Sequence, residues 1–180
     1  MPLDFRLLSM TELRTRPGEI FDRVAEGGEA FIVEKGGRRK ACLVPLSVFF
    51  PDVPPRRIAH EIDELHKHGE TTRVEITPDR ELALCFTCAL PDTSSVEVKI
   101  VLPHGYPSSC PRVYANLGND PVPHRWPDGA LCLYGVLTGW NPGRHTALST
   151  LNLARQWLDR YSVWRQAGTW PMIEGAQHDR

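Results

Sequence analysis

The 180-residue sequence contains no apolar run close to the roughly 18 residues that a membrane-crossing helix requires. Its first residues, MPLDFRLLSMTELR, also lack the basic-then-apolar order of a secretory signal. Because both features are missing, we expect a cytoplasmic protein that does not associate with a membrane.

The sequence also has almost no net charge, because 21 Lys and Arg residues stand against 22 Asp and Glu residues. No whole-chain field therefore draws the protein to nucleic acid, and any DNA contact must come from a local patch. Five cysteines are too few, and odd in number, for a secreted disulfide scaffold, so each is interpreted as a separate thiol. With 41% hydrophobic and 24% charged residues, the composition is that of a folded globular protein.

Motifs for nucleotide and metal cofactors are missing as well. There is no Walker phosphate loop, glycine-rich dinucleotide turn or zinc-protease helix. Cys85 and Cys88 form a C-x-x-C pair, but side chains three apart in a strand point to opposite faces, which favours packing over metal binding. His60 and His68 can share one face of a helix, and such a face more often meets solvent than metal. We expect no cofactor and no metal site.

Prolines divide the chain near residue 55. Pro51, Pro54 and Pro55 remove backbone donors and hold the residues before them extended, which is typical of a linker. The length of the chain also suits a small module beside a compact larger one. We therefore predict two domains, residues 1–55 and residues 56–180.

The first segment contains the signals of a strand, helices and a hairpin. FRLL is a strand candidate, and Ser9 with Glu12 forms the S-x-x-E pattern that predicts a helix start. Pro17 marks a break or a new first turn, and apolar residues recur near helical period on both sides of it: Leu13, Ile20, Phe21 and Val24. Gly36 and Gly37 separate two β-rich runs, which predicts a hairpin with positive φ at its tip.

Four stretches of this segment occur in a characteristic order: S-M-T-E-L-R, R-P-G-E-I-F-D-R-V, G-G-E-A-F-I-V-E-K-G-G-R and A-C-L-V-P-L-S-V-F. On these residues the segment resembles the N-terminal module of the prevent-host-death (Phd/YefM) antitoxins, over about residues 3–50. The resemblance implies a small α/β module that forms a symmetric homodimer and binds operator DNA. In that family a disordered tail neutralises a toxin, whereas here a second folded segment takes the place of the tail.

The resemblance also implies which basic residues meet DNA. Arg14, in the first helix, and Lys35, before the hairpin tip, match DNA-facing positions of the family. Arg38, Arg39 and Lys40 extend the patch. The module carries eight basic and eight acidic side chains, so only clustering supplies phosphate contacts. A solvated hairpin tip is the alternative interpretation.

The second segment predicts one helix, four strands, an irregular loop and a final helix. Ile58, Ile62 and Leu65 recur at helical spacing before Gly69. RVEIT, ELALCFTCAL, VEVKIVL and RVYANL are rich in β-branched and apolar residues, and the short turns between the first three predict an antiparallel meander. An apolar stripe from Thr146 onward predicts a helix that covers one face of the sheet. This order is that of an α+β fold.

Three motifs follow one another in this segment: Tyr106-Pro107 with Pro111-Arg112-Val113, His124 with Gly129-Ala130-Leu131-Cys132-Leu133, and Trp140-Asn141-Pro142. On these residues the chain resembles ubiquitin-conjugating (UBC) enzymes over about residues 57–171, most closely the bacterial branch found in anti-phage and other modifier-conjugation operons. The resemblance implies a UBC-like fold and thioester (acyl) transfer. It also implies two partners, a ubiquitin-like modifier and its activating enzyme.

The catalytic cysteine of the family corresponds to Cys132, which would accept the C-terminal carbonyl of the modifier as a thioester and pass it to an amine. Sulfur suits this step because a thiolate is a strong nucleophile and a workable leaving group. Cys42, Cys85, Cys88 and Cys110 lie in predicted strands or between prolines. A buried structural thiol is the alternative interpretation of Cys132.

His124, Asp128 and Asn141 are the other candidate catalytic residues. Eukaryotic members of the family carry His-Pro-Asn ahead of the cysteine, whereas His124-Arg125-Trp126 stands here and the asparagine is absent. His124 can order the loop or move protons, Asp128 can orient an attacking amine, and Asn141 can donate to an oxyanion. The alternatives are a structural role for His124 and turn formation for Asp128 and Asn141.

Together the two resemblances predict a fusion of an antitoxin-like dimerisation and DNA-binding module with a domain that conjugates through Cys132. The main alternative is an autoregulating antitoxin whose UBC-like domain is inactive and binds a toxin or a modifier. An adaptor with neither activity is a third interpretation. Neighbouring genes discriminate between them, because an activating enzyme and a modifier favour conjugation whereas a small toxin favours the antitoxin.

Overall fold

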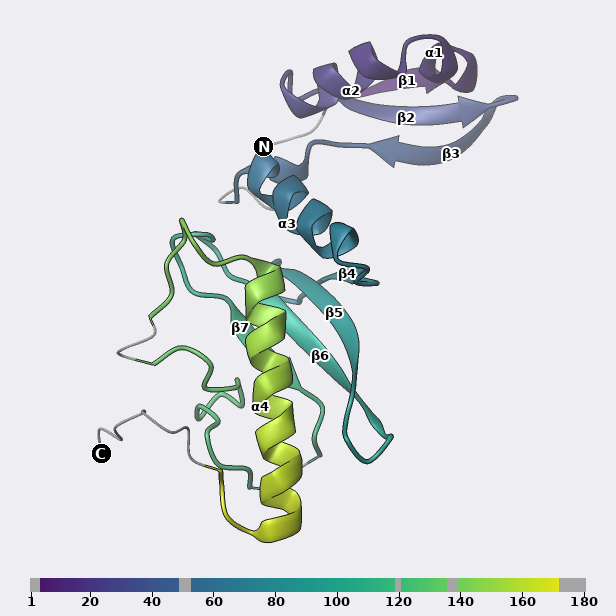
Figure 1. The fold of residues 1–180 in the computed structure, drawn as a ribbon. Coiled ribbons are helices and arrows are strands. Elements are labelled where there is room, and N and C mark those ends of the chain that lie inside the picture. Colours follow the sequence, from purple (N-terminus) through teal and green to yellow (C-terminus); the bar gives the residue numbers. More distant parts are fainter. Residues whose placement is uncertain (1–3, 49–52, 119–120, 136–138, 172–180) are drawn as a thin grey trace. The chain divides into compact units, whose positions relative to one another are not determined.

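The computed structural model describes residues 4–48, 53–118, 121–135 and 139–171 of the chain. It divides into two compact units, Met1–Arg56 and Arg57–Arg180, which are described separately (Figure 1). No helix among the described residues is both long enough and apolar enough to span a bilayer.

Unit 1 is a three-stranded sheet with two helices. Its elements are β1 (Phe5–Ser9), α1 (Met10–Thr15), α2 (Pro17–Ala25), β2 (Ala30–Lys35), β3 (Arg38–Leu43) and a short 3-10 turn (Leu46–Val48). The strand order is β1-β2-β3, with β1 parallel to β2 and β2 antiparallel to β3. Both helices lie on the same side of this sheet (Figure 1).

The short sequence motifs of unit 1 adopt the local structures predicted for them. The Ser9 side chain accepts from the Glu12 N–H at 3.1 Å and the Glu12 carboxylate accepts from the Ser9 N–H at 3.0 Å, which confirms the helix start. Pro17 opens α2, where its missing N–H costs no hydrogen bond. Gly36 and Gly37 have φ of 60° and 71°, which confirms the hairpin, because two left-handed residues make the turn that matches strand twist.

The core of unit 1 fills only one face of its sheet. The buried residues of this core are Leu8, Ile20, Val24, Phe31 and Val33. On the opposite face Leu7 pairs with Ile32, which in turn pairs with Cys42, and Leu7 is 63% exposed. Phe21 of the predicted apolar stripe is also on the surface, at 53% exposure. A considerable apolar area of this small unit therefore remains uncovered.

Unit 2 has the predicted order of one helix, four strands, a loop and a helix. Its elements are α3 (Pro55–Lys67, which begins at the boundary), β4 (Arg73–Ile76), β5 (Leu82–Ala89), β6 (Ser95–Leu102), β7 (Arg112–Ala115) and α4 (Ala147–Ala167). The sheet is a fully antiparallel meander in the order β4-β5-β6-β7. α4 packs along it and contacts β6 (Figure 1). Gly69 and Gly168 end the two helices with φ of 75° and 70°.

Strand β5 is buried on both faces, and its two cysteines point to opposite sides. Cys88 lies against Arg155 of α4, whereas Cys85 lies beside Glu75 and Lys99. Burial raises the pKa of both thiols. Glu75 and Cys85 belong, with Glu97, to the one cluster of potential metal ligands in the described part of the chain. Lys99 Nζ lies 2.8 Å from Glu75, and Arg73 Nη2 lies 3.0 Å from Glu97, so cations of the protein already pair with both carboxylates.

Candidate active site around Cys132

Cys132 directly follows a tight hairpin that is joined to the sheet. Arg125 pairs with Leu131, and the Leu131 N–H donates to the carbonyl of Val113 in β7 at 2.7 Å. Gly129, with φ of 85°, allows the chain to reverse between them. The sheet therefore fixes the backbone one residue before Cys132.

His124 holds Cys132 through its main chain. The carbonyl of His124 accepts from the Cys132 N–H at 2.9 Å and from the indole Nε1–H of Trp157 at 3.1 Å. Its own φ is 57°, and its ring lies 4.8 Å from the Trp170 ring, centroid to centroid. The contacts of this backbone agree with the structural role that the sequence left open for His124.

The Cys132 thiol is partly exposed and borders a cleft of about 530 Å³. One wall is a single face of α4, where residues three, four and seven apart share one side of the helix. The other wall is the loop that leads into this helix. The described lining residues are Cys132, Leu133, Tyr134, Gly139, Asn141, Arg144, His145, Leu153, Gln156, Trp157 and Arg160.

Electrostatics do not activate the resting thiol. Burial raises the pKa of Cys132 above its ordinary value of 9.0, because an apolar environment disfavours the thiolate. Burial also raises the pKa of Cys85, Cys88 and Cys110. The pKa of the thiol therefore does not single out Cys132. Cys132 differs from the other cysteines in that it follows the hairpin anchored to β7 and borders the cleft of about 530 Å³.

The predicted partners of Cys132 are not all in this cleft. Asn141 lines it, and the Asn141 Oδ1 accepts from the Gly143 N–H at 2.9 Å, as a turn-forming asparagine does. Asp128 instead lines a neighbouring cavity of about 420 Å³, together with Cys110. The Asp128 Oδ1 accepts from the Ala130 N–H at 3.0 Å, which stabilises the hairpin turn. The structure thus brings Asn141, but not Asp128, to the cleft of Cys132.

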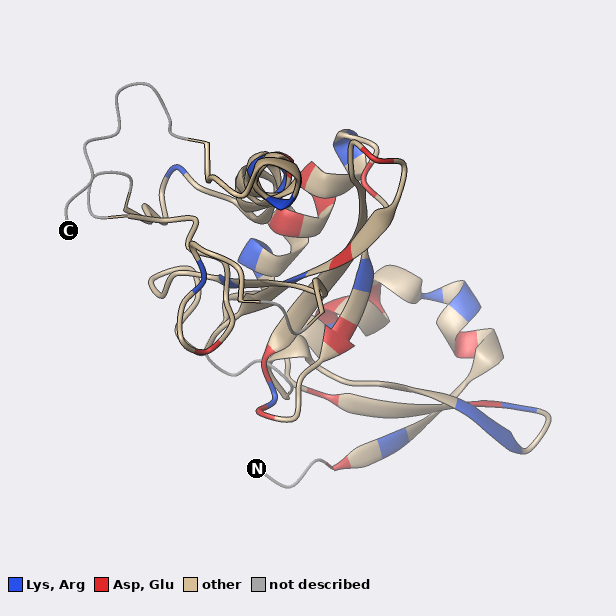
Figure 2. Ribbon diagram, turned by 90° about the horizontal axis from the view of Figure 1, so that it is seen from below, with Lys and Arg blue, Asp and Glu red and all other residues tan. Residues whose placement is uncertain are grey.

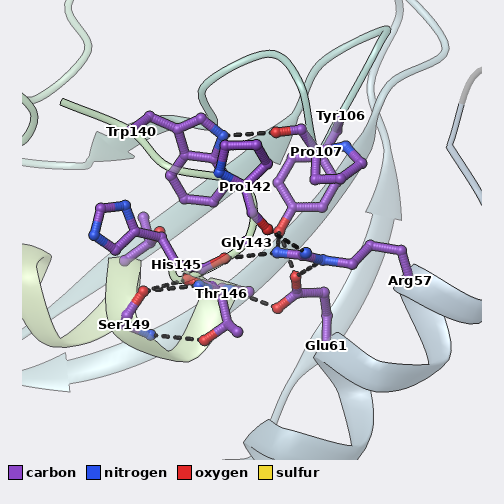
Figure 3. A network of polar contacts seen from close by, with 12 residues as sticks. Arg57, Glu61, Tyr106, Pro107, Trp140, Pro142, Gly143, His145, Thr146 and Ser149 are labelled. Carbon is purple, nitrogen blue, oxygen red and sulfur yellow. Dashed lines mark hydrogen bonds and ion pairs between the residues drawn. The ribbon is translucent and has the colours of Figure 1, made fainter.

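A buried ion pair that the sequence analysis missed fixes the loop wall of the cleft (Figure 3). Glu61 of α3 is fully buried, and its carboxylate lies 2.5 Å from Arg57 Nε. Arg57 then donates to the carbonyls of Pro142 at 2.8 Å and His145 at 2.6 Å. The second carboxylate oxygen of Glu61 accepts from the Ala147 N–H at 2.6 Å. Side chains of α3 therefore hold both the loop at Pro142 and His145 and the start of α4 in place.

Two aromatic residues complete this network. The Tyr106 hydroxyl donates to Glu61, and it accepts from Arg57 Nη2 at 3.2 Å. Burial and the bond to Glu61 raise the pKa of Tyr106 well above its ordinary value, so the phenol stays protonated. The Trp140 indole donates to the Pro107 carbonyl at 2.6 Å, which joins two of the sequence motifs (Figure 3). All of these groups pair, as buried polar groups must.

A signal for this network exists in the sequence. Glu61 lies in the apolar stripe of α3, three residues after Ile58 and four before Leu65, where a charged side chain is buried only with a partner. Arg57 precedes Glu61 by four residues, which places the two on one helix face. The remaining partners are more than 40 residues away in the chain, and spacing alone does not identify them.

The predicted DNA-binding residues lie on unit 1. Arg14 is in the last turn of α1, and Lys35 faces Arg38 across the hairpin of β2 and β3. Arg39 follows in β3 opposite Glu34. All four basic side chains are exposed, and Figure 2 shows basic residues on the hairpin of β2 and β3, beside its turn.

Comparisons with solved structures find proteins with ubiquitin-conjugating and UEV domains. The ubiquitin-conjugating enzyme E2 from Plasmodium falciparum is 20% identical, with a TM-score of 0.43, covering 58% of this chain and 96% of that one. Human ubiquitin-conjugating enzyme E2 G1 is 18% identical, with a TM-score of 0.43, covering 59% and 96%. A complex of the Vps23 UEV with ubiquitin gives 22% identity and a TM-score of 0.43, covering 61% and 86%. Comparison with curated proteins gives no match.

A comparison with protein families gives one match, to the type II CBASS E2 protein, over residues 61–178. The matched region covers more than half of the chain, including Cys132 and both walls of its cleft. The chain therefore belongs to the type II CBASS E2 protein family, which gives it an E2-like role in CBASS defence.

Proposed function

We propose that unit 2 carries the C-terminal carbonyl of a ubiquitin-like modifier as a thioester on Cys132 and transfers it to an amine. The observation that carries this proposal is the position of Cys132. Its partly exposed thiol follows a hairpin anchored to β7 and borders a cleft large enough for a few residues of a peptide. The proposal adds the reaction and its residue to the E2-like role of the family.

The first step is a transfer between two sulfur atoms. Cys132 Sγ bonds to the carbonyl carbon of the modifier, the thioester bond to the activating enzyme breaks, and the proton of Cys132 ends on the leaving thiol. An amine then attacks the same carbonyl, the new amide forms, and Cys132 leaves as a thiol with a proton from the amine. No oxidant or reductant takes part in either step.

Burial of Cys132 favours the thioester intermediate over the free thiolate. Apolar surroundings penalise an anion, which is why the pKa of this thiol is raised. A thioester carries no charge, so the same surroundings do not penalise it. Leu153 and Trp157 of the cleft wall also limit access of water to the ester. The cleft thus protects the intermediate, whereas deprotonation of the free thiol is the step that burial disfavours.

The other predicted residues take different roles in this proposal. His124 positions Cys132 through its carbonyl. Asn141 lies at the cleft, where its amide group donates to the oxyanion as the carbonyl is attacked. Asp128 lines the adjacent cavity, and its carboxylate attracts the cationic acceptor amine from that side. Leu133 and Tyr134 line both cavities, so the two routes meet beside Cys132.

The test is a charging assay with the activating enzyme and modifier of the same operon, with ATP, followed by intact-mass spectrometry. The wild type is expected to gain the mass of one modifier, and reductant should remove it. Cys132→Ala should abolish the adduct, whereas Cys110→Ala, at an exposed cysteine beside the neighbouring cavity, should retain it. Cys132→Ser should give an ester that resists reductant. An adduct that survives in Cys132→Ala would contradict the assignment.

Two observations favour a second candidate function. Burial raises the pKa of Cys132, and Asp128 lies in a different cavity, which is the arrangement of an unreactive thiol. In this case the protein is an autoregulating DNA-binding antitoxin, and unit 2 binds a toxin or a modifier without chemistry. A folded wild type that binds the modifier but is never charged would support this candidate.

For unit 1 we propose an antitoxin-like (Phd/YefM) module that forms a homodimer and contacts operator DNA. Uncovered apolar side chains support dimerisation, because Leu7 on the open face of the sheet and Phe21 on α2 are each more than half exposed on a unit with a very small core. The exposed Arg14, Lys35, Arg38 and Arg39 support contacts to phosphates. Two copies of the module in a dimer would double this basic surface.

A further inference from the structure

Two arginines at the Cys132 cleft form no ion pair within the part of the chain that the structure describes. α4 carries three arginines, and two of them are paired within unit 2. Arg155 binds Glu70 through two contacts of 2.7 Å, and Arg165 binds Asp92. Arg160 lines the cleft instead and forms no ion pair with any residue that the structure describes.

Arg144 stands on the opposite wall of the same cleft. It is exposed, its N–H donates to the carbonyl of Asn141 at 3.1 Å, and among the described residues its guanidinium has no acidic partner. The described lining residues of the cleft include two arginines and no carboxylate. A cleft lined by one sign of charge raises the local concentration of ligands of the opposite sign.

The positive charges of Arg144 and Arg160 do not stabilise the thiolate form of Cys132. A cation close to Cys132 would favour the thiolate and lower its pKa, yet burial raises that pKa. Nor do they favour the acceptor, because the amine of a lysine side chain is cationic and two guanidinium groups repel it. The remaining occupant is the donor, the segment whose carbonyl is bound to Cys132.

We propose that Arg144 and Arg160 determine the specificity of charging, by binding an acidic side chain of the donor segment close to the carbonyl that reacts with Cys132. The inference rests on the proposed function, since it concerns the donor of the same thioester. The size of the cleft, about 530 Å³, admits a short extended tail and excludes a folded domain. Leu153 and Trp157, which also line the cleft, contact the apolar parts of such a tail.

The experiment uses the full chain and synthetic peptide thioesters, which charge a cysteine without an activating enzyme. Three tetrapeptide thioesters end in glycine and differ only in the preceding residue, which is Glu, Gln or Lys. Intact-mass spectrometry follows the rate of adduct formation on Cys132. A partly exposed ion pair changes such a rate by about three- to fivefold, so two arginines should favour the Glu probe over the Gln probe by about tenfold.

The variants distinguish the effect of the two cleft arginines from the effect of the overall positive charge of the protein. Arg144→Gln and Arg160→Gln should each reduce the preference to about threefold, and the double variant should remove it. Arg165→Gln, which removes an arginine of the same helix outside the cleft, should keep the tenfold preference. High salt should weaken the preference in the wild type, because these side chains are partly open to solvent. The Lys probe should be the slowest of the three.

Each failure has a distinct meaning. Equal rates for the Glu and Gln probes, with the adduct on Cys132, would overturn the role of the arginines and leave the thioester function standing. A preference that persists in the double variant would also overturn it, because other groups would then select the acid. A folded protein that none of the three probes charges would overturn the proposed function and this inference together.

Discussion

The replacement Arg57→Ala tests whether the buried ion pair organises the active-site cleft. It leaves the fully buried carboxylate of Glu61 without its cation and frees the carbonyls of Pro142 and His145. Breaking a buried pair from one side costs about 3–5 kcal/mol. The lower end applies, because the Arg57 side chain is 17% exposed and Glu61 keeps its bond from the Ala147 N–H. We expect a loss of about 3 kcal/mol in the free energy of unfolding of unit 2.

Tryptophan fluorescence measures this quantity in the full-length protein, because all five tryptophans, from Trp126 to Trp170, lie in unit 2. Urea unfolding of the wild type and the variant gives the difference. Arg155→Ala is the matched control, since it breaks a two-contact Arg–Glu pair whose arginine is 40% exposed. That pair is worth about 1 kcal/mol or less. Arg57→Ala with Glu61→Leu should cost less than the sum of the single changes, because the stranded carboxylate is gone.

Arg57→Ala should also disturb the geometry of the cleft, more than it changes the Cys132 thiol itself. Arg57 anchors the loop at Pro142 and His145, and this loop forms one wall beside Cys132. Charging by a peptide thioester should therefore slow, by about tenfold, while the fold of unit 2 persists without denaturant. If Arg57→Ala cost no more stability than Arg155→Ala, the reasoning about the buried pair would be refuted.

Four further predictions concern other parts of the chain. Because burial raises the pKa of Cys132, its alkylation by iodoacetamide should still accelerate above pH 9, and a rate that levels off near neutral pH would contradict the raised pKa. The hydrogen bond from Arg155 lowers the pKa of Glu70 below 4.5. This pair should therefore stabilise unit 2 above pH 4.5 and lose its effect as the pH falls through the lowered pKa. The unfolding free energies of the wild type and Arg155→Ala should accordingly converge in acid. Leu7→Asp with Phe21→Asp should shift the protein from dimer to monomer in light scattering while tryptophan fluorescence stays native, and a wild type that is monomeric at high concentration would exclude the dimer. Arg14→Ala with Lys35→Ala should weaken binding to the upstream DNA of the operon and flatten its salt dependence by about two units, whereas unchanged binding would remove both residues from the interface.

Sequence reasoning succeeded where a few neighbouring residues determine the structure. The Ser9–Glu12 capping box closes within one turn, and the left-handed Gly36 and Gly37 reverse the chain by themselves. The apolar pattern of β5 and the helix start at Thr146 depend on similarly short distances along the chain. The order of elements and the position of the cysteine loop after the sheet follow from such local signals.

The composition of the active-site cleft depended on tertiary structure. Asp128 is closer to Cys132 in sequence than Asn141 is, yet Asn141 shares its cleft and Asp128 does not, because the hairpin turn directs residue 128 to the other cavity. Arg160 lines the same cleft as Cys132 because α4 packs along the sheet.

The ion pair of unit 2 shows the same division between local and tertiary information. The sequence alone shows an arginine and a glutamate four residues apart in the apolar stripe of α3. The partners of this pair, the carbonyls of Pro142 and His145, lie 85 and 88 residues away. A local pattern can predict that a buried carboxylate needs a cation, because desolvation is costly anywhere in a core. Only the packing of α3 against the loop decides which backbone atoms the pair then holds in place.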